Sequence, residues 1–206
     1  MMNYNFFALV SRMKYIERWA LMRNSRAENL SEHSLEVAMI AHALCTIGNV
    51  RYGHKLDADK AAVVGLFHDA SEIITGDMPT PVKYYNKDIK TAYKEVEKVA
   101  EEHIIDKLPD DLKDEYRKIF FKDATKFTDE EEKEEEAYMR RLVKAADKLS
   151  ALIKCMEEEN SGNREFRTAK EATLKSIEEL AVSMPEVRDF MDEFLPSYGK
   201  TLDELE

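Results

Sequence analysis

The segment at positions 61–72 constrains the fold most, because it places three ionisable side chains at the end of an apolar run. Its first seven positions are apolar, His68 and Asp69 follow directly, and Glu72 comes three residues after Asp69. The pattern predicts a helix over 57–76. An imidazole and a carboxylate next to each other can both reach one cation at the edge of such a helix. Glu72 would neighbour both on the same face, so its carboxylate could hold a water molecule beside the cation.

The rest of the chain also has the pattern of helices. Six glycines and five prolines among 206 residues leave little material for the turns of an all-β protein. Apolar residues recur at steps of three and four, which predicts helices over about 6–19, 30–47, 57–76, 88–108, 109–122, 128–160, 164–182 and 185–195. We therefore expect an all-α helical bundle. The length favours a single domain over 1–206, with a core over about 6–160 and C-terminal helices over about 163–206.

Several residues predict local details of these helices. Asn29 or Ser31 can cap the second helix, and Thr128 with Glu131 can form a capping box for the long one. Gly65 interrupts an apolar helix, where glycine costs about 1 kcal/mol against alanine. Such a glycine indicates close approach by another helix.

A proline-rich segment follows the predicted helix over 57–76. Pro79 and Pro81 flank Thr80, which predicts an extended and stiff loop suited to a fixed wall beside a site. The alternative is a plain connector between two helices.

The charge of the chain favours some partners over others. With 31 basic and 42 acidic side chains, the formal net charge is -11, so we expect neither a nucleic-acid polymer nor an anionic membrane as the main partner. Residues 1–30 differ, because five basic side chains and two acidic ones give this stretch a net charge of +3. They are Arg12, Lys14, Arg18, Arg23 and Arg26, against Glu17 and Glu28. This asymmetry suits a small anion, although these arginines could also simply pair with acidic surface residues.

Cysteine usage and hydropathy predict a cytoplasmic location. Cys45 and Cys155 stand alone, without a C-x-x-C motif, which is typical of reduced thiols that serve in packing. The chain has no run of roughly 18 apolar residues and no charge pattern of a signal peptide at its start.

Two more residues can act as metal ligands. His33 falls in the first turn of the second helix, on the face that continues through Val37 and Ile40, so it points toward the core. A single histidine there is usually a satisfied core residue, unless other ligands accompany it. Asp147 lies at the edge of the buried stripe of the long helix, where a carboxylate needs a cation or good hydrogen bonds.

The other histidines are not candidates. His42 lies half a revolution away from His33, and we expect His54 and His103 at the surface.

Together the candidates form a plausible ligand set of two imidazoles and two carboxylates. Such a set suits a divalent ion such as Mn, Co, Fe or Zn and leaves positions for water and substrate. The expected metal ligands are His33, His68, Asp69 and Asp147.

The order His, then His-Asp, then Asp on a helical chain resembles the HD-domain metal-dependent phosphohydrolases. The segments at 11–19, 21–24, 28–34 and 68–83 further resemble the 5′-deoxynucleotidases of the YfbR type. The resemblance is dense over about 6–85 and returns at Val143–Cys155.

This resemblance implies an HD-domain bundle that hydrolyses nucleoside 5′-monophosphates, with 2′-deoxyribose preferred, using one divalent ion such as Co²⁺ or Mn²⁺. Glu72 would orient or deprotonate the attacking water, and Arg18 would orient the phosphate. The implied substrate contacts are Arg18, Trp19, His33, Asp69, Asp77, Thr80 and Lys83. The resemblance also implies a homodimer. The expected contributors are apolar side chains near the end of the chain, namely Phe190, Met191, Phe194 and Leu195.

Other functions remain open at this level. Other HD-domain enzymes hydrolyse deoxynucleoside triphosphates, cyclic dinucleotides or alarmones, although triphosphates call for more cations than Arg18, Arg23, Arg26 and Lys83 provide. A non-catalytic nucleotide sensor or helical interaction module is the alternative from a different class. A bundle with accidental His and Asp residues is the plainest alternative.

Overall fold

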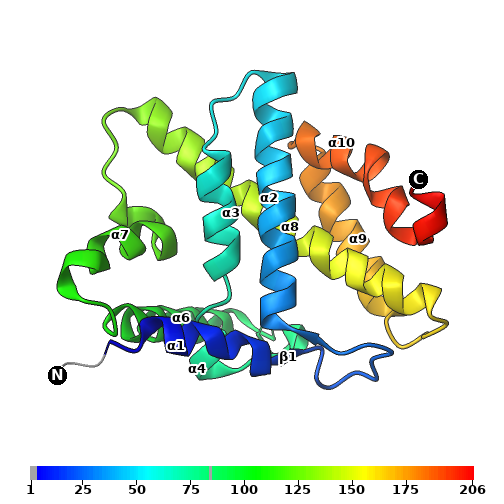
Figure 1. Cartoon of the computed structure of the whole chain (residues 1–206), viewed down its shortest axis with the longest axis horizontal. Coiled ribbons are helices and arrows are strands. Elements are labelled where there is room, and N and C mark those ends of the chain that lie inside the picture. Colours follow the sequence, from blue (N-terminus) through cyan, green and yellow to red (C-terminus); the bar gives the residue numbers. More distant parts are fainter. Residues whose placement is uncertain (1–3, 84) are drawn as a thin grey trace. The chain divides into compact units, whose positions relative to one another are not determined.

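The computed structural model describes residues 4–83 and 85–206, except for the side chains of residues 80 and 81. Helices make up most of this part of the chain (Figure 1). They are α1 Phe6–Val10, α2 Leu30–Tyr52, α3 Ala58–Phe67, α4 Glu72–Thr75, α5 Thr80–Lys83, α6 Lys87–Ile105, α7 Asp110–Phe120, α8 Glu130–Asn160, α9 Arg167–Ala181 and α10 Pro185–Glu193. Short 3-10 helices cover Ser11–Tyr15, Lys122–Ala124, Leu195–Gly199 and Leu202–Glu204. Two short strands, β1 (Glu17–Arg18) and β2 (Glu28–Asn29), pair antiparallel. The prediction of an all-α protein is confirmed.

The chain divides into two compact units. The first holds the described residues of 1–21, 27–34 and 66–126, and the second holds residues 22–26, 35–65 and 127–206. In the first unit, the core is a buried cluster with partly buried aromatic and aliphatic side chains around it. The buried members are Phe6, Ile104 and Leu108, and the surrounding ones are Val10, Phe67, Ile73, Tyr116 and Phe120. This packing fixes both ends of the segment between α3 and α4.

The second unit is built on the long helix α8. The predicted stripe on this helix is buried from Leu142 to Ile153, whereas Met156 is partly exposed. Helix α9 packs against α8, and α10 packs against α9. Both cysteines are buried and neither forms a disulfide within the described part of the chain, as the sequence predicted. Among the described residues, no helix combines the length and apolar character that crossing a bilayer requires.

Helix α2 begins where the sequence predicted but ends later. Oδ1 of Asn29 accepts hydrogen bonds from the backbone N–H groups of Ser31 and Glu32, and Glu32 accepts from the backbone of Asn29, so Asn29 is the cap. The helix does not stop before Gly48, as predicted, but continues to Tyr52. A glycine fits there because an added Cβ would lie 3.0 Å from Glu186. Gly53, with a φ of 74°, follows the helix instead.

The helix predicted over 57–76 is interrupted at its most polar point. It breaks after Phe67, residues 68–71 form turns, and α4 begins at Glu72. In this segment the N–H of Ala70 bonds to the carbonyl of Phe67, and the N–H of Glu72 bonds to that of Asp69. These bonds close tighter turns than an α-helix does, because they join residues three positions apart rather than four. Tertiary packing thus overrides the local helical period.

The helix predicted over 6–19 is also wrong after Val10. Instead of reaching Trp19, α1 ends at Val10 and a 3-10 helix follows. Ile16 is extended, and its carbonyl accepts a hydrogen bond from the N–H of Leu30. Pairing with a segment more than ten residues away therefore replaces the local helix.

Three smaller predictions need correction. Asp129, not Thr128, caps α8, and it accepts from the N–H of Glu132. The segment after Pro79 is the short helix α5 rather than an extended loop, since proline is tolerated in a first helical turn. Pro109 caps α7 instead of occupying its first position.

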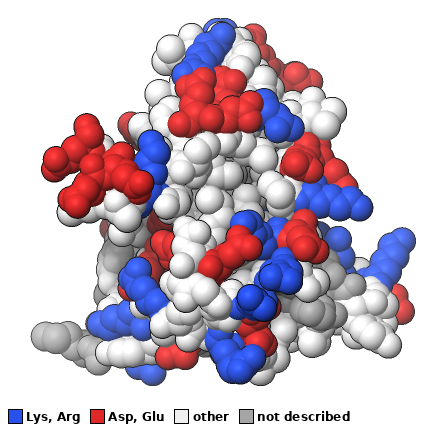
Figure 2. All heavy atoms as spheres, turned by 90° about the vertical axis from the view of Figure 1, so that its right-hand side faces the viewer, with Lys and Arg blue, Asp and Glu red and all other residues white. Residues whose placement is uncertain are grey.

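Charged side chains of both signs are interspersed on the face shown in Figure 2. Several form ion pairs within a unit, such as Arg51 with Glu193 at 2.6 Å. The acidic run at 129–136 is mostly exposed, as predicted. Exposed pairs of this kind contribute little stability each.

The predicted close approach at Gly65 is confirmed and gives a first test. A Cβ at this position would lie 2.9 Å from the Cα of Ala38 and 3.0 Å from its backbone nitrogen. Since backbone atoms cannot move aside cheaply, we expect Gly65→Ala to lower the free energy of unfolding by about 1–3 kcal/mol. Urea unfolding followed by circular dichroism measures this change.

Gly199→Ala is the matched control for this prediction. Its added Cβ would meet its nearest neighbour, Asn160, at an ordinary 3.8 Å, so its stability should stay near that of the parent. Equal or greater stability of Gly65→Ala would contradict the packing argument, because alanine is otherwise the better helix former.

Candidate metal and substrate site

Two imidazoles and one carboxylate oxygen meet in the first unit. His33, in the first turn of α2, is completely buried, as its predicted face implied. Its Nε2 lies 3.6 Å from Oδ2 of Asp69, and Nε2 of His68 lies 3.0 Å from the same oxygen. The two imidazole rings are 5.2 Å apart between centroids. The turn at 68–71 brings His68 and Asp69 to His33.

This arrangement fits a transition-metal ion. Metal bonds of about 2.1 Å with right-angled or tetrahedral geometry place neighbouring ligand atoms roughly 3.0–3.5 Å apart. The distances from the two Nε2 atoms to Asp69 are close to this spacing, and one ligand nitrogen of His33 lies within 4.8 Å of one of His68. The donor set of imidazole and carboxylate is also the kind that such ions prefer. Asp147, the other predicted ligand, lies on α8 in the second unit and is partly buried.

Glu72 is a buried carboxylic acid next to this cluster. Its side chain is 6% exposed, and within the described part of the chain its Oε2 has no hydrogen-bond partner. Burial raises the pKa of Glu72 to about 9, and the negative charges of Asp69 and Asp77 add to this effect. Lys83 and Arg18 act in the opposite direction. This shift favours the protonated form of Glu72 at neutral pH in the metal-free chain, and shifted pKa values of this kind are more frequent at functional sites than elsewhere.

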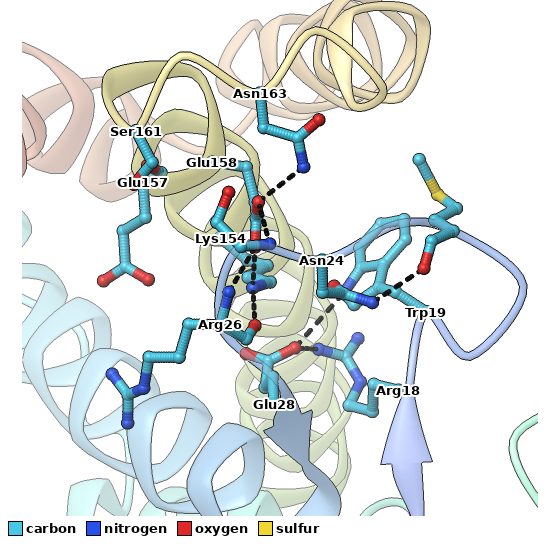
Figure 3. A network of polar contacts seen from close by, with 12 residues as sticks. Arg18, Trp19, Asn24, Arg26, Glu28, Lys154, Glu157, Glu158, Ser161 and Asn163 are labelled. Atoms are coloured by element: carbon cyan, nitrogen blue, oxygen red, sulfur yellow. Dashed lines mark hydrogen bonds and ion pairs between the residues drawn. The ribbon is translucent and has the colours of Figure 1, made fainter.

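Arg18 and Trp19 share one acceptor that the sequence did not single out. Oε2 of Glu28 accepts a hydrogen bond from Nη1 of Arg18 at 2.6 Å and another from the indole Nε1 of Trp19 at 3.2 Å (Figure 3). The guanidinium also lies over the indole ring, 5.7 Å from its centroid. In the sequence argument Glu28 was one of two acids near the start of the chain and the first residue of the segment 28–34 that resembles the family, but it was given no role.

The backbone of Trp19 is strained. Its φ of 58° is the only positive value at a non-glycine residue in the described part of the chain. Such a conformation in a bulky residue costs of order 1–3 kcal/mol and persists only where the surroundings enforce it. The N–H of Trp19 donates to Oδ2 of Asp77 at 3.3 Å, so this contact helps to hold it. The structure thus brings together two residues predicted as sugar contacts.

Lys83 lies in a separate set of contacts in the first unit. Its Nζ lies 2.7 Å from Glu97 and 4.9 Å from the centroid of the Tyr93 ring. Burial lowers the pKa of Lys83, but the hydrogen bond and charge of Glu97, together with the charge of Glu72, raise it overall. The side chain of Thr80 lies outside the described part of the structure.

The two partners Glu28 and Glu97 were missed for the same reason. Each lies at least ten residues from the cation that it binds, so no local pattern pairs them. For Glu28, its place in the segment 28–34 that resembles the family was the one available signal. The side chain of His54, expected at the surface, is 37% exposed, and its Nε2 lies 3.1 Å from the buried Glu186.

Comparison with known proteins decides the family. The family model described as 5′-deoxynucleotidase YfbR-like matches residues 5–198. The chain belongs to this family. A 5′-deoxynucleotidase of Shewanella oneidensis, for example, is 47% identical over 203 residues, which cover 98% of this chain and 97% of that protein. The resemblance noted from the sequence motifs is confirmed.

Solved structures place this YfbR-like chain in the HD-domain fold. An HD-domain phosphohydrolase of Listeria innocua matches with a TM-score of 0.77 at 25% identity, over 94% of this chain and 88% of that chain. An HD phosphohydrolase of cyanophage S-2L, bound to dA and one catalytic Zn²⁺ ion, shares the fold with a TM-score of 0.64 at 19% identity. That match covers 94% of this chain and 96% of the phage chain.

Proposed function

We propose that this protein is a metal-dependent 5′-nucleotidase that hydrolyses deoxynucleoside 5′-monophosphates to nucleoside and phosphate and prefers 2′-deoxyribose to ribose. The observation that carries the proposal is the meeting of His33, His68 and Asp69 beside the buried Glu72, in a chain that belongs to the YfbR-like family. Buried titratable groups of this kind gather at catalytic sites more often than elsewhere.

The proposed ligands of one divalent ion are His33, His68, Asp69 and Asp147, and Co²⁺, Mn²⁺ or a similar transition metal suits them. When bound, the ion supplies positive charge to the phosphoryl oxygens and lowers the pKa of water. His33 and Asp69 also contact the phosphate. With the ion bound, its charge would favour the ionised form of Glu72, whose carboxylate then orients the attacking water and takes up its proton.

The remaining residues recognise phosphate and sugar. The planar fork of Arg18 matches phosphate oxygens, and Lys83 and Thr80 contribute more weakly from α5. The indole of Trp19 lies against the 2′ carbon, where a ribose hydroxyl would be crowded. Asp77 accepts a hydrogen bond from the 3′-hydroxyl. Since few of these contacts reach the base, the enzyme tolerates several bases.

A substrate and metal panel tests this proposal. Chelator-stripped protein receives Mn²⁺, Co²⁺, Zn²⁺ or Mg²⁺ in turn, and phosphate release is measured from dAMP, dCMP, dGMP, dTMP, AMP and dATP. We expect metal-dependent release from all four deoxynucleoside monophosphates. Phosphate release from AMP should be at least about tenfold slower than from dAMP, because steric crowding of one hydroxyl changes the rate by about this factor. No release is expected from dATP.

The other outcomes of the panel are equally informative. Hydrolysis of dATP alone would keep the metal site and contradict the substrate. No release with any metal would point to a nucleotide sensor instead of an enzyme.

We also infer a cytoplasmic homodimer. Two buried cysteines that form no disulfide are typical of a reducing compartment. Of the apolar side chains near the end of the chain, Phe190 and Leu195 are buried within the second unit itself, whereas Phe194 is 44% exposed. Phe194 is thus the better candidate for a contact with a second copy. Light scattering, which gives the molar mass in solution, tests the pairing.

A further inference from the structure

Glu28 connects two residues of the proposed substrate site through a single oxygen. It lies directly opposite Arg18 in the β1–β2 ladder, where facing side chains are close enough to interact. Both side chains of this pair are only 12% exposed. The bond from Arg18 is short and charge-assisted, and the bond from the indole of Trp19 ends on the same atom. One carboxylate thus fixes the guanidinium and the indole relative to each other (Figure 3).

Trp19 depends on such support. Its backbone has a φ of 58°, which a bulky residue adopts only when its surroundings enforce it. Asp77 binds the backbone N–H of Trp19, a contact that does not itself set the rotation of the indole ring about its side-chain bonds. The hydrogen bond to Glu28 restricts that rotation, because it fixes the direction of the indole N–H.

We propose that Glu28 is a positioning residue that holds Arg18 for the phosphate and Trp19 for the sugar, and thereby sets the preference for 2′-deoxyribose. The inference rests on the proposed function, since it takes Arg18 and Trp19 as substrate contacts. Glu28 itself does not touch the substrate. It acts through the orientation of its two partners.

Two substitutions separate the two partners. Glu28→Gln keeps an oxygen that accepts from the indole but removes the charge that holds Arg18. We expect kcat/KM for dAMP and AMP to fall together, by about tenfold, with their ratio unchanged. Glu28→Ala removes both bonds. In this variant we expect the same fall in kcat/KM for dAMP. We also expect the ratio of kcat/KM for dAMP to kcat/KM for AMP to fall by about tenfold, because the indole no longer excludes the 2′-hydroxyl.

The chain offers a readout that needs no substrate, because Trp19 is its only tryptophan. Quenching of tryptophan fluorescence by acrylamide therefore reports on this one indole. In Glu28→Ala we expect stronger quenching and an emission shifted to longer wavelength, whereas Glu28→Gln should match the parent. If the parent fails to hydrolyse dAMP, the proposed function fails, but the quenching comparison still tests the role of Glu28.

Glu102→Gln is the matched control. Glu102 binds Arg117 through two hydrogen bonds of 3.2 and 2.6 Å in the same unit, on α6 and α7. The same change of charge there should leave the quenching and both kcat/KM values at the parental level. Parental quenching and an unchanged substrate ratio in Glu28→Ala would overturn the proposal. If Glu28→Ala does not fold, parental kcat/KM values in Glu28→Gln would overturn it instead.

Discussion

Glu72→Gln is expected to lower the turnover of dAMP by about 10²–10⁴-fold, the usual contribution of a positioned acid or base. Glutamine keeps the shape of the side chain but can neither take up nor release the proton of the attacking water. The fold should tolerate it, because the pKa of Glu72 is raised to about 9 and the carboxyl is already neutral at pH 7 in the metal-free chain. Turnover under saturating metal and dAMP measures the effect.

Two further measurements make this result specific. Metal content after gel filtration should equal that of the parent, since Glu72 is not among the proposed ligands. Glu186→Gln changes another completely buried carboxylate, which binds Tyr138 in the second unit, and it should retain turnover. Parental turnover in Glu72→Gln would refute the role of Glu72, whereas unchanged nucleotide binding with no turnover in any variant would favour a sensor.

The second large effect is expected at a buried ion pair in the second unit. Lys154 and Glu158 are 3% and 1% exposed, and Nζ of Lys154 donates to Glu158 and to the carbonyl of Arg26 (Figure 3). Glu158 also accepts from the backbone N–H of Ser25 at 2.8 Å and from Asn163 at 2.7 Å. The pair therefore ties the loop at 22–26 to the end of α8.

Glu158→Gln should lower the free energy of unfolding by about 3 kcal/mol at pH 7, because it leaves the ammonium of Lys154 buried without its counter-charge. Urea unfolding measures the change. Glu159→Gln, at the next position, removes an exposed carboxylate that pairs with Lys170, so it should stay close to the parent. Equal stability of all three proteins would contradict the assigned role of the pair.

The same pair predicts a pH dependence with a definite sign. Despite burial, the hydrogen bonds to Glu158, led by that from Lys154, lower its pKa from an ordinary 4.5 to about 2. A carboxyl with a lower pKa in the folded state stabilises the protein above its unfolded pKa and loses that contribution as the pH falls. The difference in stability between the parent and Glu158→Gln should therefore shrink between pH 4.5 and pH 2. A constant difference over this range would contradict the pKa assignment.

The double variant Lys154→Met with Glu158→Met distinguishes charge pairing from packing. Replacing both charges by apolar groups of similar size is often neutral or stabilising, whereas removal of one partner is not. We therefore expect the double variant to be more stable than either single substitution. If it is the least stable, the hydrogen bonds to Ser25 and Asn163 outweigh the ion pair.

The sequence by itself determined the helical class and most of the proposed site. Helices can be predicted from periodic apolar residues because the spacing that places these residues on one face is a local property of the sequence. The face of His33 was predicted correctly, and so was the close approach at Gly65. Ionisable groups at the end of an apolar segment indicate a site, because their burial costs free energy unless they have a partner. This made His68, Asp69 and Glu72 recognisable.

Only the tertiary structure decided how these side chains are held. The turn at 68–71 replaces a helix that local propensity favoured, because packing of α3 and α4 against α6 fixes both of its ends. The shared contact with Glu28 follows from pairing between β1 and β2, and the positive φ of Trp19 is held in part by Asp77, 58 residues away in sequence. Such pairings join residues distant in sequence, and their free energy depends on the whole unit, so no local pattern encodes them.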